Sequence, residues 1–198
     1  MSEAERDEPT AVTPIPANMA PIRLLVCSIG NPGSAYANTL HSAGHTVLNA
    51  LSSSLSYPSF QNSKAYAGTV SEGSDFTLWQ SPSYMNVSGT PVAKAWKQFV
   101  KEGRDAKLVV VHDELELPLG QVNVKNGSAS PKGHNGLKSI KGTVGPNFMR
   151  IGVGIGRPES REPHAVASYV LRKMTPQERF QIEGCVGRVE MELRKLAG

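Results

Sequence analysis

Apolar residues form two kinds of pattern along most of the chain. From residue 21 onward, short continuous apolar runs alternate with stretches in which apolar residues recur at helical spacing. Short apolar runs predict buried strands, and helical spacing predicts helices that pack one face on them. The predicted strands are 22–29, 65–70, 76–80, 108–112, 121–125 and 148–155, and the predicted helices are 39–55, 87–102, 134–142 and 175–196.

This alternation of strands and helices predicts an α/β fold. We expect one domain, residues 21–198, built as three layers with a mixed β-sheet flanked by helices. Residues 121–125 alternate polar and apolar positions, which is typical of an edge strand. The last helix has a recognisable start, because Thr175 can cap it, Pro176 suits the first helical position and Glu178 can complete a capping box.

Composition sets the N-terminal segment apart from the rest. Residues 1–20 contain several prolines and no apolar block, so we expect a disordered tail that is neither a secretory signal nor a typical transit peptide. This segment holds four of the 17 acidic residues but one of the 21 basic residues. Residues 21–198 therefore carry 13 acidic and 20 basic residues, a net charge of +7. Such a surface would attract a polyanion such as RNA.

Two further features narrow the class of protein. No apolar run is long enough to cross a bilayer, which argues against a membrane role. The two cysteines, Cys27 and Cys185, have neither the number nor the spacing of a disulfide framework or a zinc site. We expect buried free thiols in a reducing compartment, the cytoplasm, with the mitochondrion as the alternative.

The first candidate for chemistry follows the first predicted strand. That strand runs into a glycine turn, residues 30–36, at the strand end where α/β folds usually bind ligands. Common Asn-Pro-Gly turn chemistry is the simpler explanation of the turn alone. The turn leads to His41, and histidine suits a general base because its ordinary pKa of about 6.5 leaves it mostly unprotonated near neutral pH. A surface or capping role for His41 is the alternative.

A second candidate ends the buried strand 108–112. Asp113 stands at its carboxyl end, where it could accept a hydrogen bond from the far ring N–H of His41. Such a bond would fix the tautomer of the imidazole and stabilise the imidazolium that forms when it takes a proton from water. The alternative is a solvated strand end, which is what we expect of Glu114 and Glu116.

Other mechanisms find less support. A metal site made of His112, Asp113 and Glu114 is disfavoured because adjacent strand residues point to opposite faces. The chain has no Gly-x-Ser-x-Gly elbow, and neither cysteine has a histidine beside it in sequence. We therefore expect no covalent nucleophile, no metal and no cofactor.

Asparagines occur where two loops meet helices. Asn86 and Asn135 could each cap a helix, since a side-chain amide can accept from exposed backbone N–H groups. Both amides can also donate and accept, which suits binding of a peptide backbone or a terminal adenosine. Considered together with the other loops, the binding role is the better interpretation.

Several segments stand in a fixed order along the chain. They are Gly30-Asn31-Pro32-Gly33, Tyr36, His41-Ser42-Ala43-Gly44, Tyr84-Met85-Asn86-Val87-Ser88-Gly89, His112-Asp113-Glu114-Leu115, Gly133-His134-Asn135-Gly136-Leu137 and Arg150-Ile151-Gly152-Val153-Gly154-Ile155-Gly156-Arg157-Pro158. Taken together, they resemble the bacterial-type peptidyl-tRNA hydrolase family, and the similarity runs from about residue 22 to the end.

The resemblance implies a monomeric, metal-independent esterase that acts on peptidyl-tRNA. It implies that His41 is the general base, that Asp113 orients it, and that a cleft binds the substrate. The implied cleft residues are Asn31, Tyr36, Met85, Asn86, His134 and Asn135. The resemblance also places Lys125 against tRNA phosphate, with Arg150 as a second candidate.

The chain departs from the family pattern in places. Leu40-His41-Ser42-Ala43-Gly44 stands where the family often has Arg-His-Asn-Ala-Gly, and the histidine is kept. Gly152 occupies the position of a second arginine common in bacterial members, which weakens the phosphate assignment of Arg150. Loop 126–132 differs from the glycine-rich bacterial versions.

The implied reaction needs few groups. An ester with a ribose oxygen as leaving group can be hydrolysed by one activated water, so we expect His41 to deprotonate water and Asn86 to support the oxyanion. Two other functions stay open: an inactive RNA-binding relative that acts in RNA processing, and a general hydrolase of small esters.

Overall fold

The computed structural model describes residues 22–103 and 105–198. The segment that we expect to be a disordered tail, residues 1–20, lies outside the described residues. The strands are β1 (Arg23–Ser28), β2 (Gln61–Ser63), β3 (Gly68–Glu72), β4 (Phe76–Gln80), β5 (Ala106–Glu114), β6 (Val122–Asn126) and β7 (Met149–Gly154). The helices are α1 (Ala43–Ser54), α2 (Gly89–Lys101), α3 (Asn135–Val144), α4 (Pro163–Leu171), α5 (Pro176–Gly184) and α6 (Val186–Ala197), with short 3-10 helices η1 (Leu40–Ser42) and η2 (Met85–Val87).

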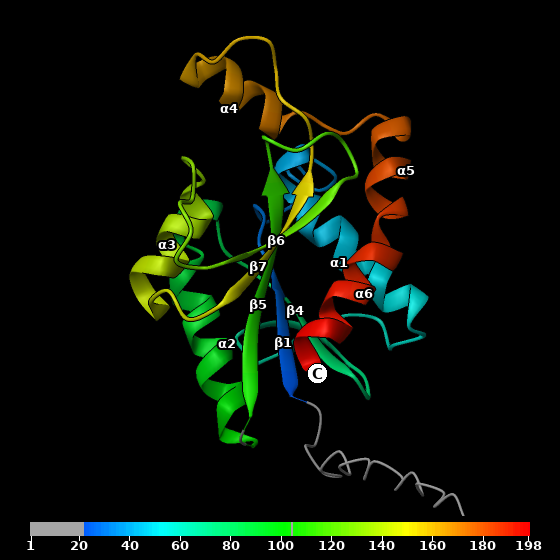
Figure 1. The fold of residues 1–198 in the computed structure, drawn as a ribbon, viewed down its shortest axis with the longest axis vertical. Helices are drawn as coiled ribbons and strands as arrows, with labels where there is room; N and C mark the ends of the chain where they lie inside the picture. Colours follow the sequence, from blue (N-terminus) through cyan, green and yellow to red (C-terminus); the bar gives the residue numbers. More distant parts are fainter. Residues whose placement is uncertain (1–21, 104) are drawn as a thin grey trace, which may run out of the picture.

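All seven strands form one sheet in the order β2-β3-β4-β1-β5-β7-β6. The central strands β4, β1, β5 and β7 pair in parallel, whereas the pairs β2–β3 and β3–β4 at one end and β7–β6 at the other are antiparallel. Helices α2 and α3 lie on one side of the sheet, and α1, α5 and α6 lie on the other (Figure 1). The predicted three-layer α/β fold with a mixed sheet is confirmed, and β6 is an edge strand as expected.

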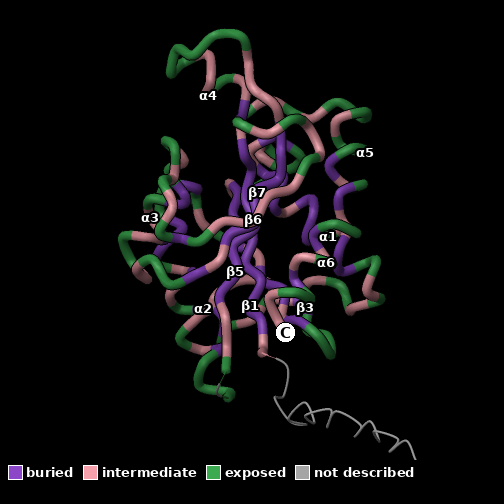
Figure 2. Tube along the Cα trace, viewed as in Figure 1, coloured by how far each residue is buried: buried purple, intermediate pink, exposed green. Residues whose placement is uncertain are grey.

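The sheet divides the hydrophobic core into two parts (Figure 2). In β1, Leu24 and Val26 pack with α1, α5 and α6, whereas Leu25 and Cys27 pack with α2 and α3. Alternate residues of a strand point to opposite faces, so a continuous apolar run is what a strand covered on both sides requires. Cys27 and Cys185 are buried free thiols, as expected.

The structure corrects two predicted elements. The predicted helix 175–196 is broken at Cys185, where glycines at 184 and 187 weaken helical continuity, and buried Ile182 and Val189 anchor α5 and α6 separately. Its predicted capping box at Thr175 and Glu178 is confirmed. The predicted strand 65–70 begins at Gly68 and pairs with the unpredicted strand β2. Among the described residues, no helix is long and apolar enough to cross a membrane.

Candidate active site

The candidate site lies where the central strands end and the helices begin. The turn after β1 carries Asn31 and leads into η1, which holds His41. Asp113 is close to the carboxyl end of β5, and η2 holds Met85 and Asn86 just before α2 begins. This edge of a parallel sheet collects side chains from segments that are far apart in sequence.

Local contacts hold the turn that carries His41. The carbonyl oxygen of Tyr36 accepts hydrogen bonds from Thr39 Oγ1 at 2.9 Å and from Ser42 Oγ at 3.0 Å. Helix α1 then approaches β5 closely at Gly44, where a Cβ atom would lie 2.5 Å from the carbonyl oxygen of Val111. Only glycine permits this approach, which brings the start of α1 against the strand that bears Asp113.

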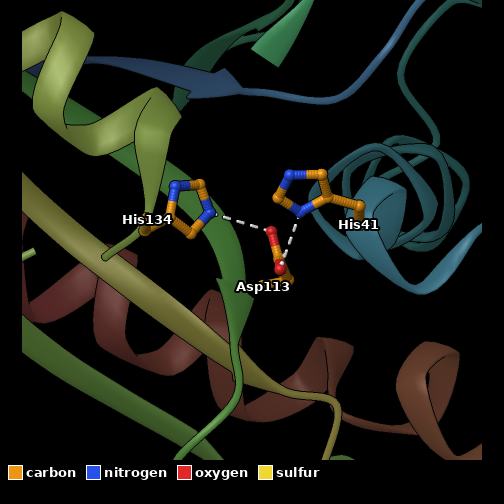
Figure 3. Close-up of side chains that lie close together, drawn as sticks. All are labelled: His41, Asp113 and His134. Carbon is orange, nitrogen blue, oxygen red and sulfur yellow. Dashed lines mark hydrogen bonds and ion pairs between the residues drawn. The ribbon is translucent and has the colours of Figure 1, made fainter. Parts of the chain in front are cut away.

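The carboxylate of Asp113 binds two histidines at once. His41 Nδ1 lies 2.9 Å from Oδ2, and His134 Nε2 lies 2.9 Å from Oδ1 (Figure 3). Asp113 is only 2% exposed, whereas the His41 side chain is 16% exposed. A buried carboxylate with both oxygens occupied is held in one position, and it fixes both rings.

The hydrogen bonds assign the ring protons. At the start of α3, His134 Nδ1 accepts from the backbone N–H of Leu137, so its Nε2 carries the proton that Asp113 accepts. Asp113 also accepts from His41 Nδ1, which leaves the lone pair of His41 on Nε2. His41 is therefore arranged as a base whose free nitrogen faces away from the carboxylate.

Electrostatics support the same arrangement. Burial alone would raise the pKa of Asp113, but the two histidines outweigh it through charge and hydrogen bonds, so this pKa lies below its ordinary value. Burial alone would lower the pKa of His41, but the charge and hydrogen bond of Asp113 raise it above its ordinary value. Asp113 thus stays ionised beside a histidine that readily takes a proton.

A neighbouring histidine is kept neutral. His112 is buried, and burial together with the nearby His134 lowers its pKa to about 3. Its Nδ1 donates to the backbone oxygen of Asp113 at 2.6 Å, and its ring meets that of His134 edge-on at 5.1 Å. His112 therefore supports the shape of the site without adding charge.

A cleft of about 600 Å³ opens beside the three residues. Its lining includes seven residues expected from the sequence: Asn31, His41, Met85, Asn86, Asp113, His134 and Asn135. Tyr36 is not in the lining, but its ring packs edge-to-face on that of Tyr84, which is, at 6.2 Å between ring centres. The expected cleft residues other than Tyr36 therefore converge, and Tyr36 contacts the cleft lining through Tyr84.

The structure rules out one of the two roles considered for the asparagines. Helix α2 is preceded by Ser88 at its cap position, and α3 is capped by the side chain of His134. Asn86 and Asn135 are exposed, and no described residue forms a hydrogen bond with either side-chain amide. Both amides are free for a ligand, and the capping interpretation is wrong. Asn31 is different, because its Oδ1 accepts from the backbone N–H of Met85 at 2.8 Å.

One wall of the cleft was missed by the sequence analysis. Helix α4 supplies an apolar surface made of Pro163, Val166, Ala167, Val170 and Leu171. Its sequence did carry a signal, namely a proline at the first helical position followed by apolar pairs spaced four residues apart. The Tyr169 hydroxyl anchors the helix by donating to the carbonyl oxygen of Ile155 at 2.7 Å.

The two residues expected to meet phosphate are already engaged. Lys125 Nζ lies 3.0 Å from Glu114 Oε2, and Glu114 is only 7% exposed, so the expectation of a solvated Glu114 is wrong. Arg150 is 3% exposed, and its Nη2 donates to the backbone oxygen of Ser130 at 2.7 Å. Neither residue lines the cleft. Glu116 is exposed, as expected, and forms an ion pair with Arg157.

Residues able to hold a metal ion are the same ones that form the hydrogen-bonded centre. Among the described residues, His41, Asp113 and His134 offer ligand atoms within 4.8 Å of one another. One nitrogen of each imidazole, His41 Nδ1 and His134 Nε2, already contacts an oxygen of the Asp113 carboxylate at hydrogen-bond distance. His112 and Glu114 point to the other face of β5 from Asp113, as the alternation of a strand requires.

Comparison with known proteins decides the family. A family model described as "Peptidyl-tRNA hydrolase" matches residues 25–198. The chain belongs to the peptidyl-tRNA hydrolase family. A "Peptidyl-tRNA hydrolase" of Leptothrix cholodnii is 41% identical over 172 residues, which cover 84% of this chain and 78% of that protein. A "Probable peptidyl-tRNA hydrolase" of Schizosaccharomyces pombe is 39% identical over 163 residues, which cover 80% of this chain and 75% of that protein.

Solved structures agree with the family assignment. The crystal structure of peptidyl-tRNA hydrolase from Acinetobacter baumannii matches with a TM-score of 0.74 and 32% identity, covering 92% of this chain and 91% of that one. A 5'-methylthioadenosine nucleosidase from Arabidopsis thaliana matches at 8% identity and a TM-score of 0.53, which shows a shared fold alone.

The structure shows which atoms surround Gly152, one of the departures from the peptidyl-tRNA hydrolase pattern. A Cβ atom at this position would lie 2.6 Å from Asn123 Oδ1 and 3.1 Å from Glu114 Cβ. Any larger residue would require both neighbours to shift. In this chain residue 152 of β7 therefore has no side chain to separate Glu114 from Lys125. The two residues form an ion pair across β7.

Proposed function

We propose that this protein hydrolyses the ester that joins a peptide, or an N-blocked amino acid, to the 3′ end of tRNA. The reaction would recycle tRNA from prematurely released peptidyl-tRNA. The observation that carries the proposal is His41, held by buried Asp113 beside a cleft, in a chain of the peptidyl-tRNA hydrolase family. We further propose that the protein acts as a monomer in the cytoplasm.

The mechanism requires one base and one activated water. His41 Nε2 removes a proton from water as the water oxygen attacks the ester carbonyl carbon. Asp113 stabilises the imidazolium that forms, and collapse of the tetrahedral intermediate breaks the bond to the ribose oxygen. His41 then returns its proton to that oxygen, so the products are a free peptide acid and tRNA.

Asn86 is the proposed donor to the developing oxyanion. Its exposed amide has no hydrogen-bond partner among the described residues, and it lines the cleft with His41. We expect Asn86→Ala to lower kcat about a hundredfold, because a donor aimed at the oxyanion is lost. Asn62→Ala changes an exposed asparagine on the distant edge strand β2 and should match the wild type. Near-normal turnover by Asn86→Ala would rule out this role.

Substrate choice tests the proposed function itself. The apolar wall of α4 suits a peptide side chain, whereas an unblocked aminoacyl-tRNA would bring an ammonium group that is costly to bury unpaired. We expect fast hydrolysis of N-acetyl-aminoacyl-tRNA with chelator present, and at least tenfold slower hydrolysis of the same tRNA with a free amine. Equal rates would contradict the selectivity. Intact esters with both substrates would instead favour the inactive RNA-binding alternative.

A further inference from the structure

The charged residues of the two helical layers are arranged differently. Helices α2 and α3 contain five lysines and no aspartate or glutamate. Helices α5 and α6 on the opposite side contain four basic and four acidic residues. The net charge of the α2–α3 layer is therefore +5, and that of the α5–α6 pair is zero.

The lysines of α2 occupy one face of the helix. Lys94, Lys97 and Lys101 are spaced three and four residues apart, so they share the solvent side, and all three are exposed. The opposite side buries Val92, Ala95 and Phe99 against the sheet. We call these three lysines and exposed Lys138 of α3 the lysine face.

The lysine face is not neutralised by neighbouring carboxylates. Among the described residues, no acidic side chain forms an ion pair with any of its four members. Glu102 follows α2 directly, but it is bound by Arg23 at 3.4 Å and by the Tyr66 hydroxyl at 2.8 Å. In contrast, the basic residues of α5 and α6 all pair with glutamates of their own helix. These pairs are Arg179–Glu183, Arg188–Glu192, Arg194–Glu190 and Lys195–Glu192.

The lysine face leads away from the cleft. Helix α2 begins directly after η2, which holds Asn86, and α3 begins with Asn135 of the cleft. The start of α2 is joined to the middle of α3, where the Gly89 N–H donates to Ser139 Oγ at 2.9 Å. At a rise of about 1.5 Å per residue, Lys101 lies roughly 18 Å along α2 from its start. A polyanion whose end occupies the cleft and that extends along α2 would therefore pass over the lysine face.

We propose that the lysine face binds the duplex of the tRNA acceptor arm while the 3′ end occupies the cleft. The proposal rests on the proposed function, which places the 3′ ester beside His41. Of the two residues first expected to contact phosphate, Lys125 is paired with Glu114 and Arg150 is buried. Phosphate contacts by unpaired lysines release counterions and do not depend on base sequence.

The test removes the charges of α2 and compares two substrates. The variant Lys94→Gln/Lys97→Gln/Lys101→Gln retains good helix formers. We expect its KM for N-acetyl-aminoacyl-tRNA to rise about tenfold at ~0.15 M salt, with kcat unchanged, and the salt dependence of log(kcat/KM) to weaken by about one slope unit per lysine that contacts phosphate. The N-acetyl-aminoacyl ester of adenosine, which lacks the duplex, should be hydrolysed at the wild-type rate.

A matched control removes three paired charges from the opposite layer. Arg179→Gln/Arg188→Gln/Lys195→Gln changes net charge equally and should leave KM for the tRNA substrate unchanged. The triple Lys→Arg variant on α2 should restore wild-type KM. Unchanged KM in the Lys→Gln variant, or an equal loss on the adenosine ester, would overturn the proposal. If wild-type protein hydrolyses neither substrate, the proposed function fails, and binding of uncharged tRNA by the same variants still tests the lysine face.

Discussion

Replacing His41 with asparagine should lower the rate of N-acetyl-aminoacyl-tRNA hydrolysis by about a thousandfold. The variant removes His41 Nε2, the free ring nitrogen that Asp113 positions by its hydrogen bond with Nδ1. General base catalysis of this kind contributes roughly 10² to 10⁴-fold to the rate. The rate is best measured in single turnover with chelator present, so that product release and metal ions do not contribute. A rate within tenfold of wild type would show that another group activates water.

The fold should survive this substitution. Asp113 keeps its hydrogen bond with His134, so the buried carboxylate is not left without a partner. We expect a loss of about 1–3 kcal/mol in the free energy of unfolding, since one hydrogen bond to a charged group is removed. His164→Asn is the matched control, because His164 is an exposed histidine of α4 outside the cleft lining, and it should retain full activity.

Replacing Asp113 with asparagine should reduce activity almost as far as loss of His41 itself, by about a thousandfold, because the base is then held in the wrong tautomer. The reason lies in the second histidine. His134 must keep its proton on Nε2, because its Nδ1 accepts from Leu137 N–H. The amide oxygen of an asparagine would therefore face His134, and its NH2 group would face His41 Nδ1. That forces the His41 proton onto Nε2, the nitrogen that must accept a proton from water.

The same variant should change the pH dependence. In the wild type, Asp113 raises the pKa of His41, so kcat/KM should fall as pH decreases through a value above the ordinary 6.5, where the base becomes protonated. In Asp113→Asn, burial dominates and the inflection should move to lower pH. Asp75→Asn removes an exposed carboxylate paired with Arg194 and should leave the inflection in place. An unshifted inflection in Asp113→Asn would contradict the assigned pair.

Both predictions depend on His134. Sequence reasoning did not anticipate that His134 is hydrogen-bonded to the same carboxylate as His41. The sequence placed His134 in the cleft and paired His41 with Asp113. His134 stands 21 residues after Asp113 in the chain, and His41 stands 72 residues before it. Only the folded chain shows that the two rings share one carboxylate, and that the cap of α3 fixes the tautomer of one of them.

The sequence by itself determined the layers, most elements and the edge of the sheet at which the predicted cleft residues meet. Continuous apolar runs can be buried on both faces only in a sheet covered by helices on each side, and polar motifs at strand ends must meet at one edge of a parallel sheet. His41, Asp113, Asn86 and Asn135 follow from these rules and from the family resemblance.

Tertiary structure alone decided which charges are free. Lys125 and Glu114 form an ion pair across β7 at Gly152, and Arg150 is buried. Helix α4 forms one wall of the cleft. These outcomes depend on strand register and on the packing of distant segments, whereas sequence periodicity reports only which face of an element is apolar. The same limit applies to the lysines of α2. Their spacing predicts that they are exposed, but the absence of a carboxylate partner among the described residues is a property of the fold.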